Sequence, residues 1–152
     1  MSATESSNTP SSIAKLPLAA AIVALAGLAD AVYLTIHHYT AEPVPCGPAF
    51  DCEMVLTSPY ATVFDIPLAA FGAAAYFAAF SLALLAAFGD RRMWTLFGVQ
   101  STLMIIFSGW LIYVQAALIG AFCQFCLISA ATTAVLFALF IISLLSKRQK
   151  AD

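Results

Sequence analysis

Four long apolar stretches constrain the fold of this chain more than any other feature. They cover residues 16–37, 66–88, 94–119 and 122–145. Each exceeds the roughly 20 residues that an α-helix needs to cross about 30 Å of hydrocarbon. Backbone exposed to lipid must satisfy its own hydrogen bonds, and none of the stretches shows the alternating pattern of a membrane β-barrel. We therefore expect an all-α integral membrane protein built on a four-transmembrane-helix bundle.

The composition supports this expectation. The chain is 62% hydrophobic and 9% charged, whereas soluble domains are about 45–50% apolar and about 25% charged. The first stretch is too long for the apolar region of a secretory signal, so it is expected to remain as a helix. The net charge of −2 says little about partners, but the absence of a basic patch argues against nucleic acid.

The basic residues predict the orientation of the bundle. The outer loop 38–65 and the turn 120–121 contain no Lys or Arg. Because short loops rich in Lys and Arg remain in the cytoplasm, both termini are expected to be cytoplasmic. One domain is expected at 15–146, with a disordered tail at 1–14 and a second tail at 147–152. All six basic residues lie on the cytoplasmic side of this topology: Lys15, Arg91, Arg92, Lys147, Arg148 and Lys150.

Four cysteines share the opposite, extracytoplasmic side. Cys46 and Cys52 bound the segment CGPAFDC of the outer loop, and Cys123 and Cys126 open the fourth helix as CQFC. This side is an oxidising compartment, in which disulfides form. The Gly-Pro turn allows the two loop cysteines to pair. The following segment, CEMVLTS, is apolar on one face and predicts a short half-helix in this cap, ended by Pro59.

The CQFC segment combines a reactive position with membrane depth. Cys123 is expected in the first turn of the fourth helix, where unpaired N–H groups and the helix dipole lower a thiol pKa. Cys126 lies on the same face and slightly deeper. Two facing dithiols suggest a relay by thiol–disulfide exchange, from the loop pair to Cys123 and out through Cys126. A quinone is the expected acceptor, because it is a lipid-soluble carrier of two electrons.

Several side chains are candidates for contact with the quinone. Gln115 lies one turn before the outer end of the third helix, and it could face the same pocket or bond to a neighbouring helix. Aromatic residues near the CQFC segment could form the wall around the ring: Phe122, Phe125 and Trp110.

Asp30 is an ionisable residue about two-thirds along the first membrane helix. Such a residue is a functional hypothesis by default. It could deliver protons, because quinone reduction consumes two, or it could be a hydrogen-bonded structural residue near the outer interface. His37 and His38 could likewise bind the quinone or lie at the interface. Trp94 fits an aromatic belt at the membrane surface.

The order of these motifs resembles that of the vitamin K epoxide reductase family. The resemblance covers roughly residues 15–146, and it rests on CGPAFDCEMVLTSPYATVFDIPLAAFGAAAY followed by CQFC at the last helix. It implies a four-helix bundle around a quinone (ubiquinone or menaquinone), covered by the loop and its half-helix. By motif position, Cys46 and Cys52 match the family's shuttle pair, and CQFC matches its active-site pair, with Cys126 nearest the quinone. Ser58 matches the serine of the cap.

The resemblance also implies a partner and a location. Bacterial members reoxidise a thioredoxin-like protein that makes disulfides in secreted proteins, so the bacterial inner membrane is expected. Some members carry a fused thioredoxin-like domain, whereas here the partner is expected to be a separate protein. Vertebrate members hold the vitamin K head group with an Asn and a Tyr, where this chain has Leu68 and Ala130. Quinone reduction is therefore expected rather than epoxide reduction.

Other interpretations of the four cysteines remain open at the level of spacing. They could form two static disulfides, or they could bind or transport a soft metal such as zinc, copper or mercury. A metal carrier would need cysteines along its pathway and on the cytoplasmic side, where this sequence has none. The other known type of bacterial disulfide-forming oxidase has its CxxC in the first outer loop, the reverse of the order here.

Overall fold

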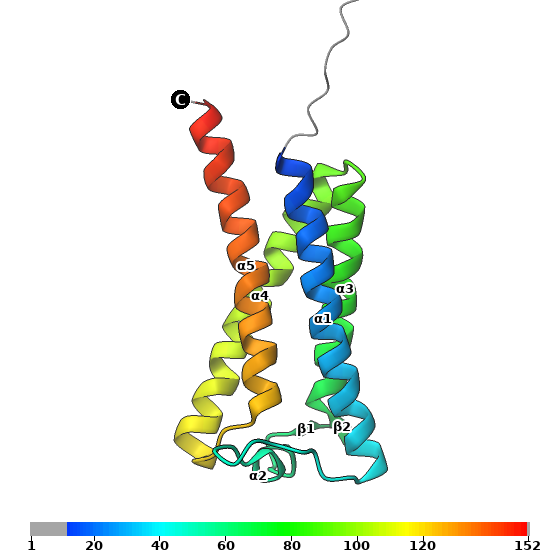
Figure 1. Cartoon of the computed structure of the whole chain (residues 1–152), viewed down its shortest axis with the longest axis vertical. Coiled ribbons are helices and arrows are strands. Elements are labelled where there is room, and N and C mark those ends of the chain that lie inside the picture. Colours follow the sequence, from blue (N-terminus) through cyan, green and yellow to red (C-terminus); the bar gives the residue numbers. More distant parts are fainter. Residues whose placement is uncertain (1–11, 152) are drawn as a thin grey trace, which may run out of the picture.

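The structure, a computed structural model, describes residues 12–151 as four long helices with a small cap at one end (Figure 1). The long helices are α1 (Ser12–Thr40), α3 (Leu68–Ala87), α4 (Arg91–Tyr113) and α5 (Gln124–Ala151). The cap contains α2 (Cys52–Leu56), β1 (Thr62–Val63) and β2 (Ile66–Pro67). Each long helix packs on two neighbours, in the order α1, α3, α4, α5 around the bundle. The predicted all-α membrane bundle with a capping half-helix is confirmed.

Large apolar side chains cover the outside of the bundle, and small ones fill much of its core. Ile22, Phe77 and Ile106 are more than half exposed, whereas Ala24 and Ala79 are fully buried. Lipid tails solvate large apolar groups, so tight helix contacts in membranes are made by small residues. Four segments are long and apolar enough to cross a membrane: Lys15–Thr40, Leu68–Ala87, Arg91–Ile119 and Gln124–Gln149.

Close helix contacts depend on glycine and on one buried indole. A Cβ at Gly27 of α1 would collide with the ring of Tyr76 from α3, and a Cβ at Gly98 of α4 would collide with a phenylalanine ring of α5. At the α4–α5 interface, the Nε1–H of Trp94 donates to Ser143 Oγ at 2.9 Å. Trp94 is buried, so its predicted place in an interfacial belt is wrong. Its N–H is satisfied by the neighbouring helix instead of by water.

Two helices extend into the predicted tails. α1 begins at Ser12, inside the predicted tail 1–14, whose first eleven residues lie outside the described part of the chain. α5 continues through most of the predicted tail 147–152 and reaches Ala151. Lys, Arg and Gln favour helix, and no Gly or Pro interrupts this end of the sequence.

The third long helix differs from the predicted one at both ends. It begins at Arg91 rather than at residue 94, because Asp90 is an N-cap whose Oδ1 accepts the N–H of Arg92 at 2.9 Å. At its far end it continues as an unpredicted π-helical turn, η1 (Val114–Ile119). Gly120 ends this turn, as predicted, with a φ of +73° that favours glycine.

The cap is built by one N-cap and one tight hairpin. Asp51 Oδ1 accepts the N–H of Met54 at 3.0 Å and starts α2. β1 and β2 then pair antiparallel around Phe64 and Asp65, whose φ angles of 52° and 62° fit a two-residue turn of type I′. This hairpin was not predicted. It occupies the first two residues of the expected helix 66–88, so α3 starts at Leu68.

The bundle has a basic end and a cysteine-containing end. The described ends of the chain lie at the upper end in Figure 1, and the cap lies at the lower end. Lys15, Arg91 and Arg92 stand at or near the starts of α1 and α4, at the upper end, and Lys147 and Arg148 stand near the end of α5.

Candidate functional site

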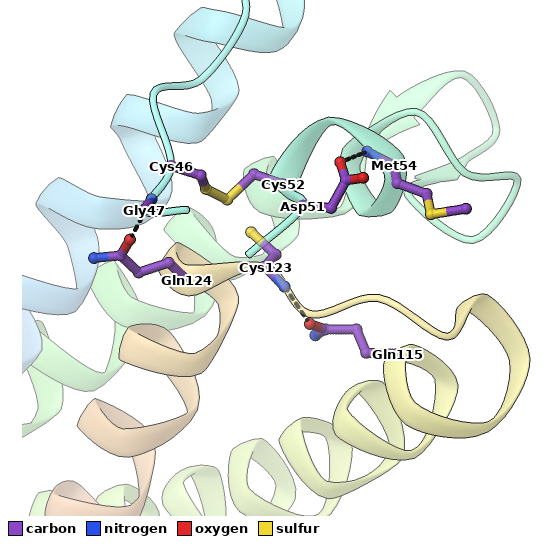
Figure 2. Close-up of a disulfide and its surroundings, with 8 residues drawn as sticks. All are labelled: Cys46, Gly47, Asp51, Cys52, Met54, Gln115, Cys123 and Gln124. Atoms are coloured by element: carbon purple, nitrogen blue, oxygen red, sulfur yellow. Dashed lines mark hydrogen bonds between the residues drawn. A yellow bond between two sulfur atoms is a disulfide. The ribbon is translucent and has the colours of Figure 1, made fainter. Parts of the chain in front are cut away.

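The four cysteines come together where the cap meets the start of α5 (Figure 2). Cys46 and Cys52 form a disulfide with Cα atoms 6.2 Å apart, while Cys123 and Cys126 are free thiols. Cys52 and Cys123 are both fully buried in one apolar cluster, and Cys46 and Cys126 pack against it. The sulfur of Cys123 points toward the disulfide in Figure 2. The two pairs expected to exchange electrons therefore share one site.

Two hydrogen bonds donated by backbone N–H groups tie the disulfide loop to the start of α5. Gly47 N–H donates to Gln124 Oε1 at 3.1 Å (Figure 2), and Asp51 N–H donates to the carbonyl of Phe122 at 3.0 Å. The two donors lie just inside the cysteines of the loop, so both halves of the loop are held against the residues that flank Cys123. The sequence pattern did not identify Gln124 as a site residue. The only indication in the sequence was its position next to Cys123.

Cys123 is the N-cap of α5, one residue before the first turn in which the sequence placed it. Its carbonyl accepts the N–H of Leu127 at 3.1 Å. The pKa of Cys123 is lowered to about 7, first because the Cys126 thiol donates a hydrogen bond to its sulfur, and then because the N–H groups of Cys126 and Phe125 do so. Burial and the charge of Asp30 act in the opposite direction. The helix terminus contributes as expected, but the neighbouring thiol has the larger effect.

Gln115 holds Cys123 from the π-helical turn. Its Oε1 accepts the N–H of Cys123 at 2.9 Å (Figure 2). An N–H at the N-cap has no acceptor within its own helix, so this bond satisfies a buried donor. π-helical turns recur at functional sites in helices, and this one carries Gln115 near its start.

A cavity of about 840 Å³ lies beneath the cap, with residues of all four long helices in its wall. This volume is within the range of about 300–1,000 Å³ that small-molecule sites occupy, and most of the wall is apolar. Cys126 lines the cavity, and Cys123 lies outside its lining. Leu68 and Ala130 also line it, and neither offers a polar side-chain group.

Three candidate residues from the sequence line this cavity, namely Asp30, Gln115 and the cap serine Ser58. The Oγ of Ser58 donates to a carbonyl of α2 at 2.7 Å, which fixes the serine at the end of the half-helix. His37 and His38 also line the cavity, at the cap end of α1.

The three predicted aromatic contacts lie outside the lining of the cavity. Trp110 is 54% exposed, because it lies between the α4 positions that face inward. Phe122 lines a smaller groove beside the disulfide loop. Phe125 packs against Tyr33 of α1, with ring centroids 5.3 Å apart and the rings tilted by 35°. Contact of these three rings with a quinone stays a prediction.

Three hydroxyl groups form a bonded set on the wall of the cavity. Tyr76 Oη donates to the carbonyl of Ser129 at 2.6 Å, and it lies 3.0 Å from Ser129 Oγ and 2.9 Å from Thr133 Oγ1. Ser129 and Thr133 follow Cys126 by three and seven residues, so the three side chains share one face of α5. From that spacing, the sequence could have predicted that Ser129 and Thr133 share a helix face with Cys126. Nothing in the sequence around Tyr76 indicated that it bonds to them.

The comparison with known families covers this whole region. Residues 18–141 match the sequence profile of the Vitamin K epoxide reductase family. The match includes all four cysteines, the cap and every residue that lines the cavity. Among residues 12–151, no three His, Cys, Asp or Glu side chains gather into a group that could hold a metal ion.

Proposed function

The chain belongs to the vitamin K epoxide reductase family, and on this premise we propose that it oxidises a protein dithiol and passes the electrons to a membrane quinone. Membership of the family makes it a membrane thiol oxidoreductase; the relay and its acceptor are the proposal. One observation carries it. Cys126 lines the cavity, and Cys123 lies in the apolar cluster that contains Cys52.

The relay begins at Cys46. Cys46 is half-buried, whereas Cys52 is only 1% exposed. A thiolate of the partner protein, which approaches from the aqueous side, therefore reaches Cys46 first. Its attack forms a mixed disulfide with Cys46 and releases Cys52 as a thiolate. The second thiol of the partner then displaces Cys46. The partner leaves with a disulfide, and the loop pair is left as a dithiol.

The second exchange passes the electrons inward. The Cys52 thiolate attacks Cys123 in a Cys123–Cys126 disulfide and releases Cys126. Cys46 then attacks Cys52 and displaces Cys123. Cys123 is a good leaving group because its pKa is lowered. The loop disulfide is restored and the inner pair is reduced, which is the bonding pattern of this structure.

The cavity fits a quinone by its volume and its largely apolar wall. A bound quinone accepts two electrons and two protons, and oxidation of the inner thiols restores their disulfide. Ser58, Gln115 and His37 offer polar groups to such a ligand from the cavity wall. Leu68 and Ala130 favour quinone reduction over epoxide reduction, because neither replaces the polar contacts of the vertebrate family members.

We place the protein in the bacterial inner membrane, with its basic end in the cytoplasm and its cysteines facing the periplasm. The segregation of basic residues supports this orientation. The electron donor in this proposal is a thioredoxin-like protein. The exposed side of Cys46 and the acidic residues of the cap face that donor.

The test uses purified protein in lipid nanodiscs, a short-chain ubiquinone or menaquinone, and a reduced thioredoxin-fold protein. We expect one quinone to be reduced for each protein dithiol oxidised. Cys123→Ala or Cys126→Ala should abolish this reaction. Cys46→Ala or Cys52→Ala should block the protein donor and spare some oxidation of dithiothreitol.

Two results would refute the proposal. Full activity with the protein donor after either loop substitution would exclude the relay. Stoichiometric bound zinc or copper, together with no loss of thiols on addition of quinone, would favour the soft-metal alternative.

A further inference from the structure

Asp30 brings a carboxyl group to the deepest part of the cavity wall on α1. The lining residues of this helix are Asp30, Ala31, Leu34, His37 and His38, and Asp30 is farthest from the cap. Its Oδ2 is buried and has no hydrogen-bond partner among the described residues. A buried, unpaired carboxylate oxygen is costly, above all inside a membrane. Such a group is therefore expected to hold a proton or to meet a ligand in the cavity.

A contact between α1 and α5 sets the level of Asp30. The ring of Tyr33 of α1 packs against that of Phe125 of α5, with centroids 5.3 Å apart, so these two residues lie at a similar depth. Asp30 is about one helical turn deeper than Tyr33, and Ser129 is about one turn deeper than Phe125. Asp30 is therefore roughly level with Ser129, just below Cys126, which lines the same cavity. The charge of Asp30 also reaches Cys123, whose pKa it raises against the stronger effect of the Cys126 hydrogen bond.

Few other ionisable groups face Asp30. From α3 the cavity receives Tyr76, whose hydroxyl is already bonded to Ser129 and Thr133. From α5 it receives Cys126, and from α4 its described lining residues are uncharged. The described lining contains no Lys or Arg to neutralise the carboxylate. The remaining ionisable residues lie toward the cap: His37, His38, Glu42, Glu53 and Tyr60.

We propose that Asp30 is the proton-transfer residue of the cavity, which takes a proton from the inner thiol pair and donates one to an oxygen of the quinone. The inference rests on the proposed function, because it assumes an acceptor that needs protons at this depth. Oxidation of Cys123 and Cys126 to a disulfide releases two electrons and two protons, and the quinone takes up both. One proton passes through Asp30, which gives it and regains it in each cycle, and the other passes from Cys126 at the wall.

The principal test is Asp30→Asn, which keeps the shape of the side chain and removes its exchangeable proton. General acid–base groups contribute about 10²- to 10⁴-fold to a rate. We expect kcat for quinone reduction to fall by about this factor, with little change in KM for the quinone. Reduction of the inner disulfide by the protein donor should keep its normal rate. Asp90→Asn is the matched control, because Asn also caps helices well and Asp90 lies outside the cavity lining.

Infrared difference spectroscopy gives a second readout that needs no quinone. We expect a carbonyl band of a protonated carboxyl to change when dithiothreitol reduces the inner disulfide, and we expect this band to be missing in Asp30→Asn. Normal turnover of Asp30→Asn, or an unchanged band, would overturn the inference. If that variant does not fold, Asp30→Glu gives the same decision, since it displaces the carboxyl and should lower kcat and shift the band. Failure of the wild type to reduce quinone would instead overturn the proposed function.

Discussion

At the residue scale, the reactivity of Cys123 depends on the thiol beside it. Its pKa of about 7, lowered chiefly by the hydrogen bond from Cys126, means that the thiolate becomes the major form as pH rises through 7. In Cys126→Ala this bond is lost, and the midpoint should move up toward the ordinary thiol value of about 8.5. The rate of alkylation of Cys123 by iodoacetamide between pH 5 and pH 10, followed by mass spectrometry, measures this midpoint.

Cys126→Ser is the matched control for this shift. Its hydroxyl can still donate to the Cys123 sulfur, so its midpoint should lie between those of the other two proteins. The backbone N–H groups at the start of α5 remain in all three. Identical midpoints in the three proteins would show that the neighbouring thiol does not set the pKa of Cys123.

Gln115 has an equally specific role at this scale. Gln115→Ala removes the acceptor of the buried Cys123 N–H, and an unsatisfied buried donor costs about 1–3 kcal/mol. We expect a lower thermal midpoint and slower exchange between Cys52 and Cys123. Gln100→Ala is the control, because Gln100 also lines the cavity from α4 and makes no side-chain hydrogen bond among the described residues. Equal effects of the two substitutions would contradict a positioning role for Gln115.

The cysteines and their supporting side chains differ in how far the sequence predicts them. Cys46, Cys52, Cys123 and Cys126 have spacings that indicate their chemistry without a structure. The bond from Gln115 to Cys123 depends on a π-helical turn that no local pattern marks. The sequence therefore does not predict the roles of supporting residues that depend on contacts with residues far away in the sequence.

At the element scale, the packing of α1 on α3 depends on the absence of one side chain. A methyl group at Gly27 would collide with the ring of Tyr76, which is buried and bonded to α5. Overpacking of this kind costs about 1–3 kcal/mol. We therefore expect Gly27→Ala to lower the thermal midpoint of the protein in a fixed detergent, and to weaken the Tyr76 hydrogen bonds.

Gly109→Ala is the matched control for Gly27→Ala. A Cβ at Gly109 of α4 meets no atom within 4 Å, and Ala favours helix over Gly by about 1 kcal/mol. The control should keep or raise the midpoint. If both variants shift it in the same direction, helix propensity rather than the contact with Tyr76 determines the result.

Membrane elements are easier to predict in length than in rotation. The four helices followed from apolar length alone, because lipid imposes that length. Their rotation did not follow, since a helix that is apolar all round shows no inward stripe, so the sequence alone could not show that Trp110 lies outside the lining of the cavity. The hairpin was missed because Phe64 and Asp65 make its turn without the usual glycine.

At the scale of the whole molecule, burial changes stepwise along the proposed relay. Cys46 is partly exposed at the cap, Cys52 and Cys123 are buried behind it, and Cys126 faces the cavity. Only the outer end of this series can meet a protein, and only its inner end can meet a lipid-soluble molecule. The relay therefore has a direction, and its use in the cell depends on which side of the membrane the cap occupies.

The orientation is tested by two reporter fusions. Alkaline phosphatase is active outside the cytoplasm, so we expect activity when it is inserted after Pro43 in the outer loop. Green fluorescent protein folds in the cytoplasm, so we expect fluorescence when it follows Asp152. The reason is the segregation of basic residues, with none in the loop 38–65. Replacing Arg91 and Arg92 by Gln while introducing lysines at Glu42 and Asp65 should weaken both signals. Phosphatase activity from the C-terminal site in the unaltered chain would contradict the orientation, and with it the exposure of Cys46 to an oxidising compartment.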